Sequence, residues 1–234
     1  MKEAIQETIA FDIYGTLIDT HGLIAMLRCH AGENASRFSQ LWRQKQLEYS
    51  FRRGLMRQYL DFGVCTAQAL HYACLAFGVS LTENETSTLL NAYRALPIFE
   101  DVAEGLGNAR DAGFRLYAFS NGKAADIRQL LDHADISRYF TDIISVDEVQ
   151  SFKPDPLVYR HFLEKAAVKA ENAWMVSANP FDVIGAVSAG MKSAWVRRSP
   201  EVIMDPWEIG PTVVIHRLSE LESAISDWRN THFG

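Results

Sequence analysis

A short apolar run that ends in an aspartate and a glycine turn is the feature that most constrains the fold of this chain. Residues 8–11 read Thr-Ile-Ala-Phe, and Asp12 and Gly15 follow them. Such a run is typical of a strand buried on both faces of a parallel sheet. Ligands bind at the carboxyl ends of such strands, which makes Asp12 a candidate site residue. A solvated aspartate in an ordinary turn is the alternative that this stretch alone leaves open.

Strand-like and helical patterns alternate after residue 97. They predict strands at 114–119, 142–146, 173–176, 193–196 and 212–215. They predict helices at 101–112, 124–132, 156–167, 180–189 and 218–228. This alternation predicts an α/β fold, a Rossmann-like parallel sheet with helices on both faces.

A helical segment interrupts this pattern between residues 20 and 96. It predicts helices at 34–49, 57–60, 66–77 and 83–95. Gly78 resembles a helix C-cap, and Thr82 with Glu85 resembles a capping box. We therefore expect two domains. Residues 1–19 and 97–234 form the Rossmann-like core, and residues 20–96 form an inserted all-helical cap domain.

Composition excludes several classes of protein. The 234 residues carry a net charge of -6 with a pI near 5.6, which argues against a nucleic-acid partner. No window approaches the length of an apolar membrane span, and residues 1–7 lack the apolar core of a signal peptide. The three cysteines form no CxxC pair. We expect a cytoplasmic protein that binds neither membranes nor nucleic acids.

Polar side chains follow, or lie close after, four separate predicted strands. They are Asp12, Ser120 with Asn121, Lys153, and the segment 177–182. Singly, these are ordinary turn residues, a surface lysine and a possible helix cap. Because the carboxyl ends of parallel strands share one edge of the sheet, we expect them to meet in one crevice.

These residues resemble the site motifs of the haloacid dehalogenase superfamily, and the resemblance covers essentially the whole chain. Residues 12–16 are similar to its first motif, Ser120 to its second, Lys153 to its third and Asp182 to part of its fourth. The inserted helices are similar to its cap domain.

Most members of that superfamily are magnesium-dependent phosphotransferases with more carboxylates than this chain has. Tyr14 stands where their first motif has a second aspartate, and Ser177 and Ala178 replace a Gly-Asp pair. Since magnesium requires oxygen ligands and charge compensation, we predict that this site holds no metal and needs no cofactor.

The chain looks more closely like the L-2-haloacid dehalogenases. The similar stretches are the nucleophile motif at 12–16, the cap-helix signature at 41–49, and the segments 120–122, 153–155 with Tyr159, and 177–182. Relatives often have Trp at the position of Phe181 and Ser at that of Ala178, so the shape of the substrate pocket is expected to differ.

The resemblance implies that the protein hydrolyses short-chain (S)-2-haloacids to (R)-2-hydroxyacids and halide through an ester on Asp12. The implied catalytic residues are Asp12, Thr16, Arg43, Ser120, Lys153, Tyr159, Ser177, Asn179 and Asp182. The implied substrate- and halide-binding residues are Tyr14, Arg43, Gln44, Leu47, Phe62, Asn121 and Phe181.

Roles follow from the chemistry that the resemblance implies. Lys153 stabilises the ionised nucleophile, and Thr16 and Ser120 donate hydrogen bonds to it or to the substrate carboxylate. Arg43 and Asn121 receive the halide, with Phe62 as a wall.

The same resemblance assigns the second half of the reaction to another set of side chains. Asp182, together with Lys153, Ser177 and Asn179, orients or activates the hydrolytic water. Tyr14 and Tyr159 shape the site and hold Lys153 or Asp182.

Bland alternatives accompany several of these assignments. An arginine such as Arg43 is usually a solvated surface charge, and Leu47 and Phe62 on helices are usually core. At the level of function, a magnesium-dependent phosphatase acting on a small phosphorylated metabolite and a regulatory protein on the same scaffold stay open. The apolar helical cap favours a homodimer.

Overall fold

The computed structural model describes residues 7–233. Residues 1–6 and 234 lie outside the described residues, and with them most of the segment in which the sequence predicts no signal peptide.

The centre of the fold is a six-stranded sheet in the order β3-β2-β1-β4-β5-β6. All neighbouring pairs are parallel. The strands are β1 Thr8–Phe11, β2 Arg115–Ser120, β3 Asp142–Ser145, β4 Ala173–Ser177, β5 Lys192–Val196 and β6 Val213–Ile215. β1 lies between β2 and β4, where the strand order reverses, and its residues are buried. The Rossmann-like fold predicted from the sequence is confirmed.

Nine α-helices occur among residues 7–233. They are α1 Ile24–Ala31, α2 Ala35–Leu55, α3 Phe62–Phe77, α4 Glu83–Ala92, α5 Val102–Asp111, α6 Ala124–His133, α7 Pro156–Lys165, α8 Pro180–Ser188 and α9 Leu221–Phe233. Short 3-10 turns are η1 Thr20–Leu23, η2 Gly32–Asn34, η3 Ser137–Tyr139, η4 Val146–Val149, η5 Ala170–Asn172 and η6 Leu218–Glu220.

The helix predicted at residues 57–60 is wrong. α2 continues to Leu55, and Arg57 then adopts a left-handed backbone conformation with φ 55°, which ends the helix. The chain runs as a loop to Asp61, whose carboxylate accepts a hydrogen bond from Val64 N and caps α3. The Gly78 C-cap and the capping box of Thr82 are confirmed.

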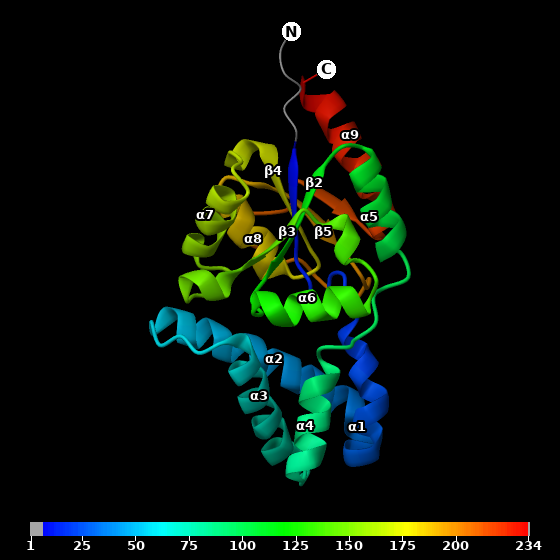
Figure 1. Cartoon of the computed structure of the whole chain (residues 1–234), viewed down its shortest axis with the longest axis vertical. Helices are drawn as coiled ribbons and strands as arrows, with labels where there is room; N and C mark the ends of the chain where they lie inside the picture. The colour runs from blue at the N-terminus through cyan, green and yellow to red at the C-terminus, as the bar shows by residue number, and fades with distance from the viewer. Residues whose placement is uncertain (1–6, 234) are drawn as a thin grey trace.

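The helices fall into two groups in Figure 1. α7 and α8 lie on one side of the sheet and α5 and α9 on the other, whereas α1 to α4 lie together below it. The long helix α2 runs beneath the sheet, with its buried side chains including Phe38, Trp42 and Gln46. α6 lies at the lower edge of the sheet, facing these helices.

The chain enters the helices α1 to α4 near residue 19 and leaves them near residue 97, and these two crossings lie side by side. Asp19 N donates a hydrogen bond to Pro97 O at 2.8 Å, and Phe99 N donates one to Leu17 O at 3.1 Å. We propose this paired crossing as the boundary between a core of residues 1–19 and 97–234 and a cap of residues 20–96.

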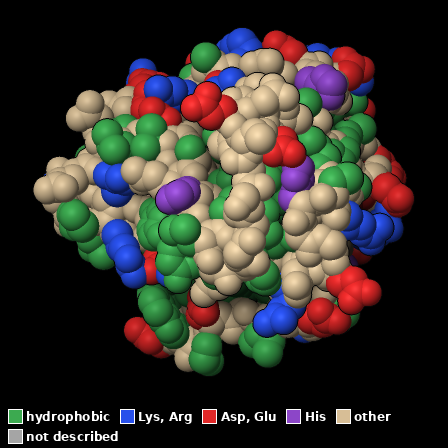
Figure 2. Space-filling model, turned by 90° about the horizontal axis from the view of Figure 1, so that it is seen from below, with side chains coloured by type: hydrophobic (Ala, Val, Ile, Leu, Met, Phe, Trp, Pro, Cys, Tyr) green, Lys and Arg blue, Asp and Glu red, His purple; other side chains and the backbone are tan. Residues whose placement is uncertain are grey.

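None of the helices in the part of the chain that the structure describes is long and apolar enough to cross a membrane. Seen from the end that carries α1 to α4, acidic and basic side chains are interspersed rather than separated by sign (Figure 2). This face therefore offers no extended basic surface for nucleic acid.

Two glycines on α5 differ in how closely neighbouring residues pack against them. A Cβ on Gly105 would lie 2.6 Å from the backbone of Leu218, whereas the nearest atom to a Cβ on Gly107 is 3.9 Å away. We expect Gly105→Ala to lower the free energy of unfolding by about 1–3 kcal/mol, since the backbone of η6 must move. Gly107→Ala on the same helix should raise it by about 0.5–1 kcal/mol. Urea denaturation measures both values, and equal shifts would contradict this packing.

Candidate active site

Asp12 lies directly after β1, and four side chains surround its carboxylate. Oδ2 accepts hydrogen bonds from Asn179 Nδ2 at 2.7 Å, Thr16 Oγ1 at 2.8 Å and Ser177 Oγ at 3.3 Å. Oδ1 accepts one from Lys153 Nζ at 3.3 Å. Among the described residues, one oxygen is therefore held by three neutral donors, while the other has the Lys153 ammonium as its partner.

The turn after β1 brings Thr16 back to Asp12. Ile13 O accepts hydrogen bonds from the backbone N–H groups of Leu17 and Ile18, and Gly15 has φ 84°, which favours glycine. The Thr16 hydroxyl also accepts from Ala178 N at 2.8 Å, which fixes its donated proton toward Asp12.

A half-buried arginine that the sequence did not single out, Arg198, stabilises this turn. Arg198 Nη2 donates to Thr16 O at 2.7 Å, and its Nη1 lies 2.7 Å from both carboxylate oxygens of Asp101. Asp101 also accepts from Leu218 N. Nothing in the local sequence marks Arg198, because its partners are 97 and 182 residues away along the chain.

Lys153 joins two carboxylates at the centre of the site. Its Nζ lies 2.9 Å from Asp182 Oδ2 and 3.3 Å from Asp12 Oδ1, and it donates to Phe119 O at 2.8 Å. The side chain is only 1% exposed. A buried ammonium requires such compensation, so the bland interpretation of Lys153 as a surface lysine is wrong.

Asp182 is fully buried beneath this lysine. Burial raises the pKa of Asp182 to about 6, although the Lys153 ammonium opposes the rise. The Tyr159 hydroxyl donates to Asp182 Oδ1 at 2.8 Å. Burial, reinforced by the Asp182 charge, raises the pKa of Tyr159 well above its ordinary value, so Tyr159 remains a donor.

Arg43 reaches the site from α2. Its Nη1 donates to Gln46 Oε1 at 2.7 Å, and its Nη2 donates to Tyr14 O at 3.3 Å. Asn179 Nδ2 donates to the same carbonyl and to Asp12, so the guanidinium is linked to Asp12 through shared partners. Arg43 is therefore no free surface charge.

Tyr14 differs from its predicted role. Its ring packs against Phe62 and Tyr93, with centroids 6.2 and 6.0 Å apart, whereas the sequence predicts that it holds Lys153 or Asp182. Tyr14 instead contributes its carbonyl to Arg43 and Asn179. Tyr159 does hold Asp182, as predicted.

Ser120 and Asn121 lie at the end of β2, but neither bonds to Asp12 in the described structure. Ser120 Oγ accepts from Gly122 N at 3.1 Å, and Asn121 Oδ1 accepts from Lys153 N at 3.0 Å. Asn121 thus fixes the backbone that carries Lys153, which leaves its Nδ2 group for other partners.

The remaining predicted residues differ in burial. Phe62 is buried at the start of α3, Leu47 is half-buried one turn after Arg43, and Gln44 is exposed. Half-buried Phe181 packs edge-on against Phe51, with ring centroids 5.0 Å apart. No described contact of Gln44 ties it to the site, so its binding role stays a prediction.

Phe51, Tyr93 and Gln46 are further neighbours of the site that the sequence did not indicate. Tyr93 packs between Tyr14 and Trp42, although it comes from the end of α4. Only Gln46 carried a local signal, because it stands three residues after Arg43 on one helix.

The carboxylates do not fit a magnesium site. Lys153 Nζ already lies between Asp12 and Asp182, where a cation shared by the two would add positive charge beside an ammonium. Within residues 7–233, no three His, Cys, Asp or Glu side chains are grouped in a way that could hold a metal ion.

Comparison with known proteins shows the family to which the chain belongs. The haloacid dehalogenase-like hydrolase family matches residues 6–190. The chain belongs to this family. It is 35% identical over 216 residues to the (S)-2-haloacid dehalogenase of Pseudomonas putida, covering 92% of this chain and 94% of that protein.

Two further relatives of this haloacid dehalogenase-like hydrolase are informative. Haloacetate dehalogenase H-2 of Moraxella sp. strain B is 37% identical, covering 82% of this chain and 86% of that protein. The L-2-haloacid dehalogenase of Xanthobacter autotrophicus with chloropropionic acid covalently bound has a TM-score of 0.87 at 28% identity, covering 94% of this chain and 98% of that one.

The Tyr159–Asp182 hydrogen bond predicts a pH effect in this hydrolase. The resemblance assigns Asp182 to the hydrolytic water, so we expect the activity to fall as the pH drops through the pKa of Asp182, which is about 6. Because the Tyr159 hydroxyl stabilises the ionised form, Tyr159→Phe should move this acid limb to higher pH by up to about one unit. Profiles of kcat against pH measure the shift. Tyr117→Phe, a buried tyrosine packed on Phe162, is the control, and an unmoved limb in Tyr159→Phe would contradict the assignment.

Proposed function

We propose that this protein is a hydrolytic dehalogenase that converts short-chain (S)-2-haloacids and water to (R)-2-hydroxyacids, halide and a proton. The observation that carries the proposal is the asymmetric environment of Asp12. Three neutral donors hold Oδ2, whereas Oδ1 faces the Lys153 ammonium. A carboxylate held in this way is a fixed nucleophile with one oxygen available for attack.

In the first step, Asp12 Oδ1 attacks the carbon that bears the halogen from the side opposite to it. The carbon–oxygen bond forms as the carbon–halogen bond breaks, so the configuration inverts and the halide leaves with the bond pair. Arg43 supplies positive charge for the halide, with Asn121 as a further donor and Phe62 as an apolar wall. We assign Leu47, Gln44 and Phe181 to binding of the substrate.

In the second step, water attacks the ester carbonyl carbon of Asp12, and Oδ2 becomes the oxyanion. The donors to this oxygen are already in place from Thr16, Ser177 and Asn179. They therefore form a preorganised oxyanion hole. The bond from the carbonyl carbon to Oδ1 then breaks, and the proton taken from the water passes to Oδ1, which becomes the hydroxyl of the released hydroxyacid. The second proton of the water is released to solvent as the Asp12 carboxyl ionises.

The hydrolytic water must lose a proton during this step. We assign that proton to Asp182, whose raised pKa of about 6 suits a general base near neutral pH. Lys153 lies between Asp182 and Asp12 and compensates the charge of both carboxylates. Ser120 is assigned to the substrate carboxylate, because its hydroxyl proton is not used by the bond from Gly122 N.

A magnesium-dependent phosphatase is the alternative within the same fold. Tyr14 in place of a second acid argues against it, as do Ser177 and Ala178 in place of a Gly-Asp pair. A regulatory protein would not require the nucleophile, the lysine and the oxyanion hole together.

Halide release from L-2-chloropropionate in the presence of EDTA tests the function. We expect release by the wild type and its loss by a factor of at least about 10³ in Asp12→Asn, because no other group forms the ester. A phosphatase assay with magnesium runs beside it. Phosphate release together with no halide release would overturn the proposal.

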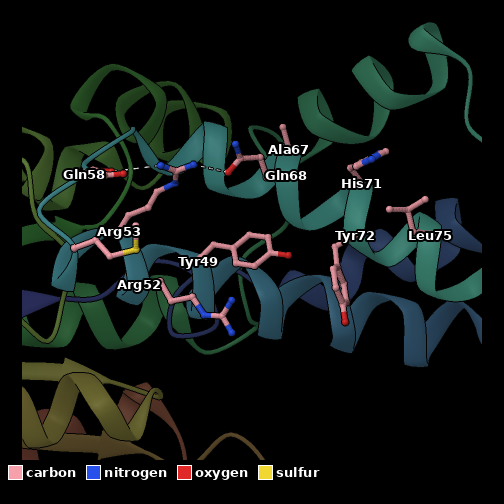
Figure 3. A pocket seen from close by; sticks show the side chains of 10 residues that line it. Tyr49, Arg52, Arg53, Gln58, Ala67, Gln68, His71, Tyr72 and Leu75 are labelled. Atoms are coloured by element: carbon pink, nitrogen blue, oxygen red, sulfur yellow. Dashed lines mark hydrogen bonds between the residues drawn. The ribbon is translucent and has the colours of Figure 1, made fainter.

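We further propose that the protein is a cytoplasmic homodimer. An exposed apolar surface on α2 and α3 supports dimer formation, with Leu55 85%, Met56 59% and Leu75 69% exposed. A cavity of about 730 Å³ adjoins it, where Arg53 donates to Gln58 O and to Gln68 Oε1 (Figure 3).

Light scattering after gel filtration tests the dimer. Leu75→Glu places a charge in the exposed apolar surface of α2 and α3, so we expect the variant to have the mass of a monomer. Ile203→Glu, at a residue that is 78% exposed between β5 and β6, should keep the mass of a dimer. A wild type with the mass of a monomer would refute the dimer and leave the dehalogenase proposal intact.

A further inference from the structure

Gln46 is a fully buried polar side chain on α2, one turn after Arg43. Its Oε1 accepts a hydrogen bond from Arg43 Nη1 at 2.7 Å, and its Nε2 donates to Thr66 Oγ1 at 2.6 Å. A buried amide with both ends satisfied is costly to rotate, because each end would then face a group of the wrong polarity.

Thr66 determines which end of the amide faces Arg43. The Thr66 hydroxyl donates its single proton to Phe62 O at 2.7 Å. Its oxygen must therefore accept from Gln46, which leaves the Gln46 oxygen for the guanidinium. The backbone of Thr66 is held in turn, since Trp42 Nε1 donates to Thr66 O at 2.9 Å.

The guanidinium of Arg43 is thereby held at two points. Gln46 fixes one terminal nitrogen, and Tyr14 O accepts from the other at 3.3 Å. Both acceptors are neutral, so they orient the guanidinium and leave its positive charge uncompensated. None of the ion pairs found among residues 7–233 involves Arg43, whereas Lys45 and Arg52 on the same helix are both paired with Glu48.

We propose that Gln46, oriented by Thr66, is a positioning residue that holds the unpaired charge of Arg43 against the departing halide. The inference rests on the proposed function and adds to it which of the two chemical steps Gln46 serves. The hydrogen bonds from Thr66 through Gln46 to Arg43 serve the displacement step, in which negative charge develops on the halogen. They have no part in ester hydrolysis at Asp12 Oδ2.

Rapid-quench measurement of the two chemical steps tests this separation. Gln46→Glu places a carboxylate of the same size against Arg43 and cancels its charge. Gln46→Met removes the acceptor at similar volume. We expect both to slow the first-turnover release of chloride by about tenfold or more, with the rate of ester hydrolysis unchanged within about twofold. Gln40→Glu, at an exposed position on α2, is the matched control.

A double-mutant cycle shows whether Gln46 acts through Arg43. In an Arg43→Met background, Gln46→Met should cause no further loss of the chloride-release rate beyond about twofold. Additive losses in the double variant would overturn the proposal, as would equal slowing of both steps in Gln46→Glu. Thr66→Val, which removes only the group that orients the amide, gives the same readout if the Gln46 variants fail to fold.

The outcomes separate this inference from the proposed function. Chloride release that depends on Asp12 but is unaffected in Gln46→Glu, Gln46→Met and Thr66→Val rejects the role of Gln46 alone. Absence of chloride release from the wild type rejects both.

Discussion

The structure depends on one buried arrangement of charge, in which the Lys153 ammonium lies between the carboxylates of Asp12 and Asp182. Removing three charged groups from water is costly unless each finds a partner within hydrogen-bonding distance. The sheet meets this requirement by bringing the carboxyl ends of β1, β2 and β4 to one edge, with Phe119 O as a further acceptor for the lysine. The site and the core are therefore stabilised by the same contacts.

Neutral groups provide the other hydrogen bonds to the charged side chains of the site. Oδ2 of Asp12 receives three neutral donors, and the Arg43 guanidinium receives two neutral acceptors. In each case the neutral partners fix the geometry of the charged group without placing an opposite charge beside it. This is the physical content of preorganisation, since polar groups that are already oriented need no rearrangement when the transition state forms.

The sequence predicted the sheet and most of the site because both depend on local patterns. Apolar runs marked the strands, and polar residues after them marked the shared edge. The sequence failed where conformation or contact is not local. Arg57 ends α2 with a positive φ, a conformation that its neighbours in the sequence do not predict. Arg198 and Tyr93 join the site through contacts with residues far along the chain, and Tyr14 turns its ring toward Phe62 rather than Lys153.

The paired crossing at Asp19 and Pro97 has a consequence for how the chain folds. β1 and β2 are neighbours in the sheet, yet the helices α1 to α4 separate them in the sequence. Pairing these strands in an open chain closes a loop of about a hundred residues, at an entropic cost that grows with the logarithm of its length. Once α1 to α4 have packed, residues 19 and 97 are already adjacent, so only short segments remain to be closed. Early packing of the inserted helices therefore shortens the search by which the central strand finds its neighbour.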